Sequence, residues 1–484
     1  MTDVLRVEYI DDVNLRVKSD AGIAQEVSDY FTFFVPGYKF MPKFKNRQWD
    51  GKIRLFNPYN ALLYAGLLPR LTKFCHDRGY KLEVDARFKE TEFDIDIAVD
   101  WIKKLNPTLP PRDYQVEAFT HAVRKRRTLL LSPTASGKSF IIYLLIRYFN
   151  VPTLVVVPTT SLVNQMFSDF EDYGFDSEKY VHKIYSGHDK NTNKPVVVTT
   201  WQSVYQLPKK WFDRYKLVIG DEAHTFKAKS LTTLMTKLTD CPYRVGLTGT
   251  LDGTETNKLV LEGLFGRVYE VTTTKALMDA GSVAQLKIEA LVLQYPDNIR
   301  KLLSSNKTDY KGEISYLIGN EARNKFIKNL SLSLKGNTFI MYRFVESHGK
   351  IIHDMIKEAT NRAVYFVSGD VSTDDREVIR KILETENDAI VVCSVGTFST
   401  GVNVKNLHNI IFAHPSKARI KTLQSIGRGL RLHSSKEHVT LYDIGDDISY
   451  KSKENHTLRH FVERIKIYVE QQFNYRFHKI RLNT

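Results

Sequence analysis

Short apolar runs alternate along most of the chain with longer amphipathic stretches. Between residues 128 and 250 the runs are TLLLS, TLVVVPTT, PVVVTT, KLVIGDEAH and YRVGLTGT, and between residues 337 and 445 they are NTFIMY, RAVYFVSG, DAIVVCS, HNIIFAH and VTLYDIG. Runs that are apolar throughout are typical of strands covered by helices on both faces of a parallel sheet. The pattern therefore predicts an α/β fold with two parallel-sheet domains in tandem.

Two seams divide the chain. LNPTLPPRDYQ, residues 105–115, is rich in proline, which excludes a continuous helix or a central strand. A weaker seam, MDAGSVAQLKI, precedes a new strand-like run, IEALVLQY. The predicted domains are a small N-terminal α+β accessory domain over residues 1–100, a first parallel-sheet domain over 101–285 and a second over 286–484 that ends in a helix.

The predicted C-terminal helix covers residues 456–477. Apolar side chains recur there at helical spacing, which favours a helix docked on the second domain; they are Leu458, Phe461, Val462, Ile465, Val469 and Phe473. Its basic residues Arg459, Arg464 and Lys466 are interpreted as a solvated face, with contact to DNA as the alternative.

The charge of the chain favours a polyanionic partner. The formal net charge of the 484 residues is +15, and the pI is about 9.3. Lysine and arginine side chains near phosphates release condensed counterions, which drives binding to nucleic acids. The hydrophobic share of 42% and the charged share of 26% are those of a globular protein, so a disordered or fibrous chain is excluded.

Other features narrow the class of protein. The three cysteines, Cys75, Cys241 and Cys393, lie far apart and predict neither a disulfide framework nor a metal cluster. No apolar run approaches eighteen residues, and the start MTDVLRVEYIDD has neither a basic nor a hydrophobic leader region. We therefore expect no membrane association and a cytoplasmic location, while protein partners stay unknown.

The stretch SPTASGKS, residues 132–139, predicts a phosphate-binding loop. It lies between a buried strand and an apolar-rich helix, an order that places backbone N–H groups and the positive helix end around phosphates. Lys138 would supply a charge to ATP, and Ser139 a hydroxyl to Mg²⁺. Serine in place of the usual first glycine is a mild departure. The predicted ATP contacts are Pro133, Thr134, Ala135, Ser136, Gly137, Lys138 and Ser139.

The stretch LVIGDEAH, residues 217–224, supplies the carboxylates that an ATPase needs at the end of another apolar strand. Asp221 would hold Mg²⁺, and Glu222 would orient and deprotonate the attacking water. The alternative is a pair of acidic residues that complements a helix dipole. The phosphate-binding loop upstream favours the catalytic interpretation.

The order of motifs over residues 111–431 resembles helicase superfamily 2, whose members have two tandem RecA-like domains. PRDYQ resembles its adenine-sensing Q motif, which implies that Arg112 and Gln115 contact ATP. VVVPTTSLVNQ resembles motif Ia and TTWQSV resembles motif Ib, which implies DNA contacts by four residues, namely Pro158, Thr159, Thr200 and Trp201.

Further motifs imply residues that couple ATP turnover to movement. In DEAH, His224 would relay the nucleotide state, and LTGT supplies Thr248 and Thr250 in place of the family's Ser-Ala-Thr motif, which leaves their partners open. SVGTFSTGVNV resembles motif V, where Gly401 permits close approach to phosphate. QSIGRGLR matches motif VI, which implies a coupling role for Gln424. Its Arg428 and Arg431 would neutralise charge on the γ-phosphoryl group.

The flanking segments are similar to those of the phage UvsW helicases. The resemblance rests on FFVPGYKFMPKFKNRQWDGKIRLFN near the start, on the motor motifs and on the ending QQFNYRF. It implies an ATP-dependent DNA helicase that unwinds or branch-migrates forks and junctions in recombination, repair and replication. The main alternative is a double-stranded DNA translocase of the XPB or restriction-motor type, and a nucleic-acid clamp without ATP turnover is a further one.

Residues 38–54 interleave aromatic and basic side chains. Such a segment favours a platform for base stacking and phosphate contact, with Lys43, Lys45 and Arg47 as candidate DNA-binding residues. The alternative is a strand whose aromatic side chains face a core while the lysines point outward.

Overall fold

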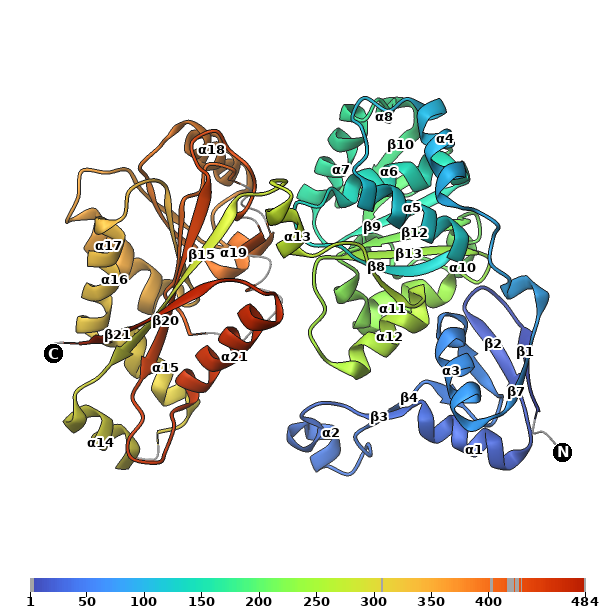
Figure 1. Cartoon of the computed structure of the whole chain (residues 1–484), viewed down its shortest axis with the longest axis horizontal. Coiled ribbons are helices and arrows are strands. Elements are labelled where there is room, and N and C mark those ends of the chain that lie inside the picture. Colours follow the sequence, from blue (N-terminus) through green and yellow to red (C-terminus); the bar gives the residue numbers. More distant parts are fainter. Residues whose placement is uncertain are drawn as a thin grey trace. The chain divides into compact units, whose positions relative to one another are not determined.

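The computed structural model describes residues 4–305, 308–400, 404–415, 422, 426–427 and 429–482 (Figure 1). The chain forms two compact units. The first comprises Met1–Ser132 and Gly137–Thr272, and the second comprises Pro133–Ser136 and Thr273–Thr484. Each unit contains one large parallel sheet, so the predicted fold of two RecA-like parallel-sheet domains is confirmed.

The sheet of the first unit has seven parallel strands, and five of them are the apolar runs predicted from the sequence. Two short edge strands complete it. In spatial order the strands are β10 (Val181–Ile184), β11 (Val196–Thr200), β9 (Thr153–Val157), β12 (Leu217–Asp221), β13 (Tyr243–Thr248), β8 (Arg127–Leu131) and β14 (Val268–Glu270).

Helices cover both faces of this sheet, which explains why its strands are apolar throughout. Alternate residues of one strand face opposite cores, as Val155 and Val156 do in β9. The core that contains Val155 lies under α4 (Ile95–Leu105), α5 (Asp113–Lys125), α6 (Lys138–Phe149) and α7 (Thr160–Asp172). The other lies under α9 (Trp201–Val204), α10 (Lys209–Phe212), α11 (Lys229–Lys237) and α12 (Glu255–Phe265). The remaining short helices are α8 (Ser177–Tyr180) and η4 (Ala223–Lys227).

The predicted N-terminal accessory domain is present as a small mixed domain. Its five-stranded sheet has the order β5 (Phe56–Asn57), β6 (Leu62–Tyr64), β2 (Asn14–Lys18), β1 (Val4–Tyr9), β7 (Lys81–Val84). Its helices are α1 (Ala21–Tyr30), η2 (Ala65–Leu67), α3 (Leu68–Arg78) and η3 (Ala86–Phe88). Residues 32–54, here called the basic hairpin, form β3 (Thr32–Phe34), η1 (Tyr38–Phe40), α2 (Pro42–Lys45) and β4 (Lys52–Arg54).

Buried polar contacts fix the accessory domain to the large sheet of the same unit. Arg70 Nε lies 2.8 Å from the buried carboxylate of Glu262 in α12, and Arg127 lies 3.2 Å from Asp12. At Gly66 a Cβ atom would lie 2.1 Å from a backbone oxygen of α12, so only glycine permits this approach. The accessory domain and the first sheet therefore form one packed body.

The sheet of the second unit repeats the arrangement with seven parallel strands. In spatial order they are β17 (Val364–Val367), β18 (Ile390–Ser394), β16 (Thr338–Tyr342), β19 (Asn409–Phe412), β20 (His438–Asp447), β15 (Gln285–Gln294) and β21 (Tyr475–Arg481). The helices in the described part of this unit are α13 (Thr274–Asp279), α14 (Asp297–Ser305), α15 (Tyr310–Gly319), α16 (Glu321–Ser333), η5 (Val345–Lys350), α17 (Ile351–Lys357), α18 (Thr373–Thr385), α19 (Val395–Thr400) and α21 (His456–Glu470).

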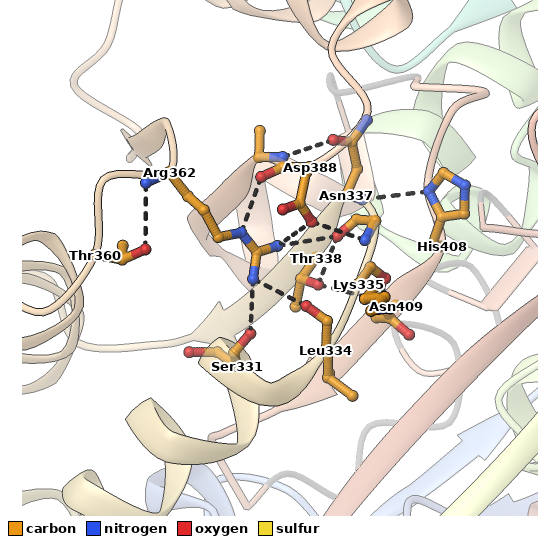
Figure 2. Close-up of polar contacts among 12 residues, drawn as sticks. Ser331, Leu334, Lys335, Asn337, Thr338, Thr360, Arg362, Asp388, His408 and Asn409 are labelled. Atoms are coloured by element: carbon orange, nitrogen blue, oxygen red, sulfur yellow. Dashed lines mark hydrogen bonds and ion pairs between the residues drawn. The ribbon is translucent and has the colours of Figure 1, made fainter.

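A polar cluster holds the amino ends of four strands in this sheet together, namely β17, β18, β16 and β19 (Figure 2). The buried Asn337 donates through Nδ2 to the carbonyl oxygens of Leu383, Glu386 and Asn406, and its Oδ1 accepts from Ala389 N at 2.9 Å. Arg362 donates to the Asp388 carbonyl at 2.9 Å. Because this cluster lies at the edge opposite the carboxyl ends of the strands, its role is to stabilise the sheet.

The C-terminal segment corrects one sequence prediction. The helix expected over residues 456–477 ends at Glu470, and Tyr475–Arg481 forms β21, which pairs with β15. A left-handed backbone conformation at Gln472, with φ 56°, breaks the helix. The solvated face expected for Arg464 is also wrong, because its buried guanidinium lies 2.7 Å from the buried carboxylate of Asp443.

Candidate ATPase site

The predicted phosphate-binding loop joins the carboxyl end of β8 to the start of α6 and consists of Pro133, Thr134, Ala135, Ser136 and Gly137. Ala135 and Gly137 have left-handed backbone conformations, with φ 68° and 78°. The Ser136 hydroxyl donates to the Pro133 carbonyl at 2.7 Å. Left-handed residues in such a loop turn successive N–H groups toward one point, which is the geometry of an anion-binding nest.

Gln115 of the predicted Q motif lies against this loop. Its Nε2 donates to the Gly137 carbonyl at 3.3 Å, while its Oε1 accepts from the backbone N–H of Arg112 at 2.9 Å. A Cβ atom on Gly137 would lie 2.4 Å from Gln115 Nε2. The structure therefore brings Gln115 and Arg112 beside the end of the loop, where glycine is required by both φ and space.

Lys138 and Ser139 are the first residues of α6. Lys138 Nζ donates to the Ser132 carbonyl at 3.3 Å, which holds the ammonium group at the carboxyl edge of the sheet. The Ser139 hydroxyl lies 2.8 Å from the hydroxyl of Tyr173, the residue that follows α7. Burial raises the pKa of Tyr173 to about 12, so its hydroxyl is neutral and serves as a hydrogen-bonding group.

Asp221 ends β12 at the same edge of the sheet. Burial, together with the neighbouring Glu222, raises the pKa of Asp221 to about 6, although Lys138 opposes both effects. Its Oδ1 is buried and makes no hydrogen bond to any residue that the structure describes. Burial of a carboxylate oxygen without a hydrogen bond lowers the stability of the folded protein. A cation bound to this oxygen would offset the loss of stability, so the Asp221 carboxylate is a suitable ligand for Mg²⁺.

Glu222 follows in a left-handed conformation, with φ 49°, and its side chain is partly exposed. Within the described ranges of the chain, no group of three or more His, Cys, Asp or Glu side chains gathers as a metal site. Mg²⁺ held at Asp221 would therefore take further ligands from Ser139, nucleotide and water, as is usual for this ion.

His224 connects the DEAH stretch with the LTGT stretch. Its Nδ1 lies 3.0 Å from the Thr248 hydroxyl and 3.3 Å from the Glu222 carboxylate. The Thr248 hydroxyl in turn donates to the Thr250 carbonyl at 3.0 Å. The structure thus supplies the partners that the sequence left open for the Thr248 hydroxyl. The buried Thr250 hydroxyl makes no hydrogen bond to a described residue.

The residues of the predicted motifs Ia and Ib lie at two further carboxyl ends of the sheet. Thr159 follows Pro158 and caps α7, and its Oγ1 accepts from Leu162 N at 3.4 Å. Thr200 is buried with its hydroxyl 2.9 Å from that of Ser203, and the Trp201 ring packs edge-on against Tyr205 with centroids 5.5 Å apart. Thr159 therefore lies at the N-terminus of α7, which its side chain caps. The hydroxyl of Thr200, in contrast, is hydrogen-bonded to Ser203.

The basic hairpin is not the strand that the alternative interpretation required. Residues 38–45 form η1 and α2, which contain no buried residue, and the Phe40 side chain is 81% exposed. Tyr38 stacks on Phe34 with ring centroids 4.7 Å apart. An open cavity of about 610 Å³ lies beside α2, lined by Lys39, Phe44, Lys45, Arg47, Gln48, Trp49 and Asp50. Lys43 lies on the same short helix.

In the second unit, Gly401, Gln424 and Arg428 lie outside the described residues. Arg431 is described and half-buried, five residues before the buried Lys436. The roles of Arg428 and Arg431 in neutralising phosphate charge stay predictions. None of the described helices combines the length and apolar character of a membrane-spanning segment.

Sequence reasoning missed two features of these units. Tyr173 belongs to none of the predicted motifs, and only the fold places the end of α7 beside the start of α6. The second is a buried pair in the second unit, in which Arg323 Nε lies 2.8 Å from Asp446 and Nη2 donates to the Ala413 carbonyl at 2.8 Å. An isolated arginine on a helix and an aspartate on a strand give no signal of their pairing.

Two RecA-like sheets, with a phosphate-binding loop and a DEAH stretch at the carboxyl edge of the first, define a motor of helicase superfamily 2. Three family models match the chain. Residues 4–85 match the N-terminal domain of the DNA helicase UvsW, residues 108–253 match the res subunit of type III restriction enzymes, and residues 321–433 match the helicase conserved C-terminal domain.

Individual relatives agree with these models. The ATP-dependent DNA helicase uvsW of Enterobacteria phage T4 is 38% identical, over 97% of this chain and 98% of that protein. The DNA 3′-5′ translocase XPB2 of Sulfurisphaera tokodaii is 24% identical, over 83% of this chain and 93% of that protein. The crystal structure of T4 UvsW covers all of both chains with 35% identity and a TM-score of 0.53.

The chain belongs to the UvsW family of ATP-dependent DNA helicases. It is an enzyme that couples ATP hydrolysis to DNA unwinding. A structure of Dbp5 from Saccharomyces cerevisiae bound to RNA, with 13% identity, a TM-score of 0.54 and coverage of 80% of this chain and 93% of that chain, shares the fold alone.

Proposed function

We propose that the chain uses Mg²⁺ and ATP to unwind or branch-migrate branched DNA, such as forks and junctions, in the cytoplasm during recombination, repair and replication. The observation that carries the ATPase part is the buried Asp221 oxygen that makes no hydrogen bond to a described residue, at the sheet edge that also carries Lys138 and Ser139. When bound, Mg²⁺ neutralises charge that develops on the transferred phosphoryl group.

Each residue then has a separate task. The loop N–H groups and Lys138 bind the phosphates, and Ser139 and Asp221 hold the cation. Glu222 orients the attacking water and accepts its proton. His224 bonds to Thr248 and contacts Glu222, so a change at the carboxylate reaches the LTGT stretch. This contact supports a coupling role for the threonines.

The first test uses Lys138→Ala. The variant loses ATP hydrolysis and strand displacement, because the loop loses its charge, while DNA binding largely remains. DNA affinity is measured by fluorescence anisotropy and hydrolysis by phosphate release. Hydrolysis that survives in Lys138→Ala would reject the assigned site, and wild-type hydrolysis stimulated equally by heparin and by DNA would argue against a DNA motor.

The basic hairpin supports the preference for branched DNA. It combines exposed aromatic side chains with cations beside an open cavity, and the accessory domain that carries it is packed on the first sheet. Replacing Lys43, Lys45 and Arg47 by alanine weakens fork binding, since removing a cation that binds a phosphate reduces the affinity for DNA. A matched control replaces three exposed cations of the same unit, Lys89, Lys103 and Lys104. Equal fork affinity in the two triple variants would remove the hairpin from the proposal.

A second candidate function is translocation on double-stranded DNA without strand separation. The similarity to an XPB2 translocase over most of both chains favours it. Strand displacement on forks, four-way junctions, plain duplex DNA and RNA duplex separates the two functions. A branch-specific helicase displaces strands from forks and junctions, whereas a translocase hydrolyses ATP on plain duplex DNA and displaces none.

A further inference from the structure

The last strand of the second sheet, β21, is an open edge. It pairs with β15 alone among the strands that the structure describes, and Figure 1 shows it leading to the C-terminus of the chain. Six of its seven residues are exposed. Strand edges of this kind present unpaired backbone groups and are usually covered or charged in native proteins.

The side chains of β21 divide into two faces, because successive residues of a strand point to opposite sides. Tyr475 and Phe477 lie on one face, followed by Lys479 and Arg481. The Phe477 ring packs edge-on against Phe461 of α21 with centroids 5.8 Å apart, which places this row on the α21 side of the sheet. Two aromatic rings and two cations therefore form a line beside α21.

This row is accessible to a partner. Tyr475 is 38% exposed and Phe477 is 52% exposed, and Val469 at the end of α21 adds an apolar side chain that is 59% exposed. Both cations of the row are exposed as well. Water-exposed aromatic rings in a soluble protein indicate a binding surface when they occur together.

The charge around the row selects the chemistry of the partner. Residues 471–482 contain three basic side chains and no aspartate or glutamate. The opposite face of β21 is already engaged, because His478 lies 2.5 Å from Glu289. Among the carboxylates of α21, Glu463 is paired with Lys466 at 2.7 Å. The row therefore combines aromatic rings with positive charge, and β21 itself contains no acidic residue that would neutralise this charge.

We propose that this row, called the β21 face, binds a single strand of nucleic acid. Bases stack on Tyr475 and Phe477, and phosphates contact Lys479 and Arg481. Exposed aromatic side chains on a strand next to cations are the arrangement by which proteins bind single strands without sequence preference. The site lies outside residues 321–433, which match the helicase C-terminal family model, and it goes beyond the ATPase and hairpin sites described above.

The experiment measures the affinity of the full chain for labelled oligo(dT) by anisotropy, without nucleotide. Tyr475→Ala with Phe477→Ala weakens binding about tenfold or more, since stacking of one base contributes about 1–3 kcal/mol. Lys479→Gln with Arg481→Gln leaves the packed rings in place and makes the slope of log affinity against log salt shallower by about 1.4. The control is Tyr59→Ala, which removes a ring that is 99% exposed elsewhere.

The outcomes are distinct. Weaker oligo(dT) binding in both β21 variants, with the control equal to wild type, supports the β21 face. Wild-type affinity and salt slope in the Lys479→Gln, Arg481→Gln variant overturn it, even if the fork unwinding proposed above is intact. A dimer in sedimentation that the β21 variants dissociate, with unchanged oligo(dT) binding, would show that a second copy covers the edge and would also overturn the proposal.

Discussion

Removal of the Tyr173 hydroxyl tests whether this group orients the Ser139 hydroxyl for binding a cation. The two hydroxyl oxygens lie 2.8 Å apart. Tyr173→Phe removes one oxygen and keeps the ring, which packs edge-on against Phe140 with centroids 5.0 Å apart. The substitution therefore removes one hydrogen bond and little packing.

The expected magnitude follows from that single bond. A hydrogen bond between neutral groups contributes about 1 kcal/mol net, which corresponds to about a fivefold change in affinity. The bond holds the Ser139 hydroxyl in one orientation, so its loss weakens binding of the Mg²⁺ complex of a nucleotide. In EDTA the Ser139 hydroxyl has no cation to bind, so the affinity for free nucleotide stays the same.

Titration of a fluorescent ADP analogue with Mg²⁺ and with EDTA measures both affinities. Tyr143→Phe is the matched control, because the Tyr143 hydroxyl accepts from Arg147 at 3.3 Å and belongs to the same aromatic cluster. In a Ser139→Ala background, Tyr173→Phe has no further effect. An equal loss of affinity in EDTA, or a full additional loss in the Ser139→Ala background, refutes the reasoning.

Three further predictions concern steric fit and acid stability. Gly137→Ala weakens nucleotide binding at least tenfold, because its φ of 78° and the 2.4 Å approach to Gln115 both oppose a Cβ atom; equilibrium titration measures it. Gly66→Ala lowers the free energy of unfolding by about 1–3 kcal/mol in urea titrations, since its Cβ atom meets the backbone of α12. Burial lowers the pKa of His348 to about 2 and of His414 to about 3. The unfolded chain therefore binds more protons below pH 6.5, and urea unfolding shows a loss of up to about 2.7 kcal/mol between pH 7.5 and 5.5.

Controls separate these effects from general damage. Gly319→Ala adds a Cβ atom in open space and leaves the urea midpoint near that of wild type. His348→Gln removes about half of the acid-dependent loss in the free energy of unfolding, because glutamine takes up no proton. An acid-dependent loss that is the same in wild type and in this variant would assign the effect to other groups.

The sequence predicts the large sheets because their strands are buried on both faces. Every residue of β9, TLVVV, is buried, and the four residues after Thr153 are apolar without interruption, which marks a strand by itself. Edge strands carry no such signal. Strand β21 reads YRFHKIR and is almost wholly exposed, and its mixture of polar and apolar residues continues the spacing of the preceding helix. The predicted helix therefore extended too far.

The candidate site likewise contains residues that the sequence predicts and residues that only the packing of the fold brings together. Lys138, Ser139, Asp221 and Glu222 follow buried strands in fixed order, and the shared carboxyl edge of a parallel sheet brings such residues together. Tyr173 contributes through its position in three dimensions, and the buried pair of Arg323 and Asp446 joins residues that are 123 positions apart. Contacts of this kind depend on packing between elements, which local spacing does not encode.

The docking of the accessory domain bears on how the motor moves DNA. Glu262, which binds Arg70, lies in α12, and α12 follows the LTGT stretch that contacts His224. Because Glu262 is buried, loss of Arg70 would remove its ion-pair partner and destabilise this contact. The accessory domain is therefore held to the element that follows Thr248 and Thr250. A rearrangement of that element during ATP turnover would displace the basic hairpin together with the first sheet.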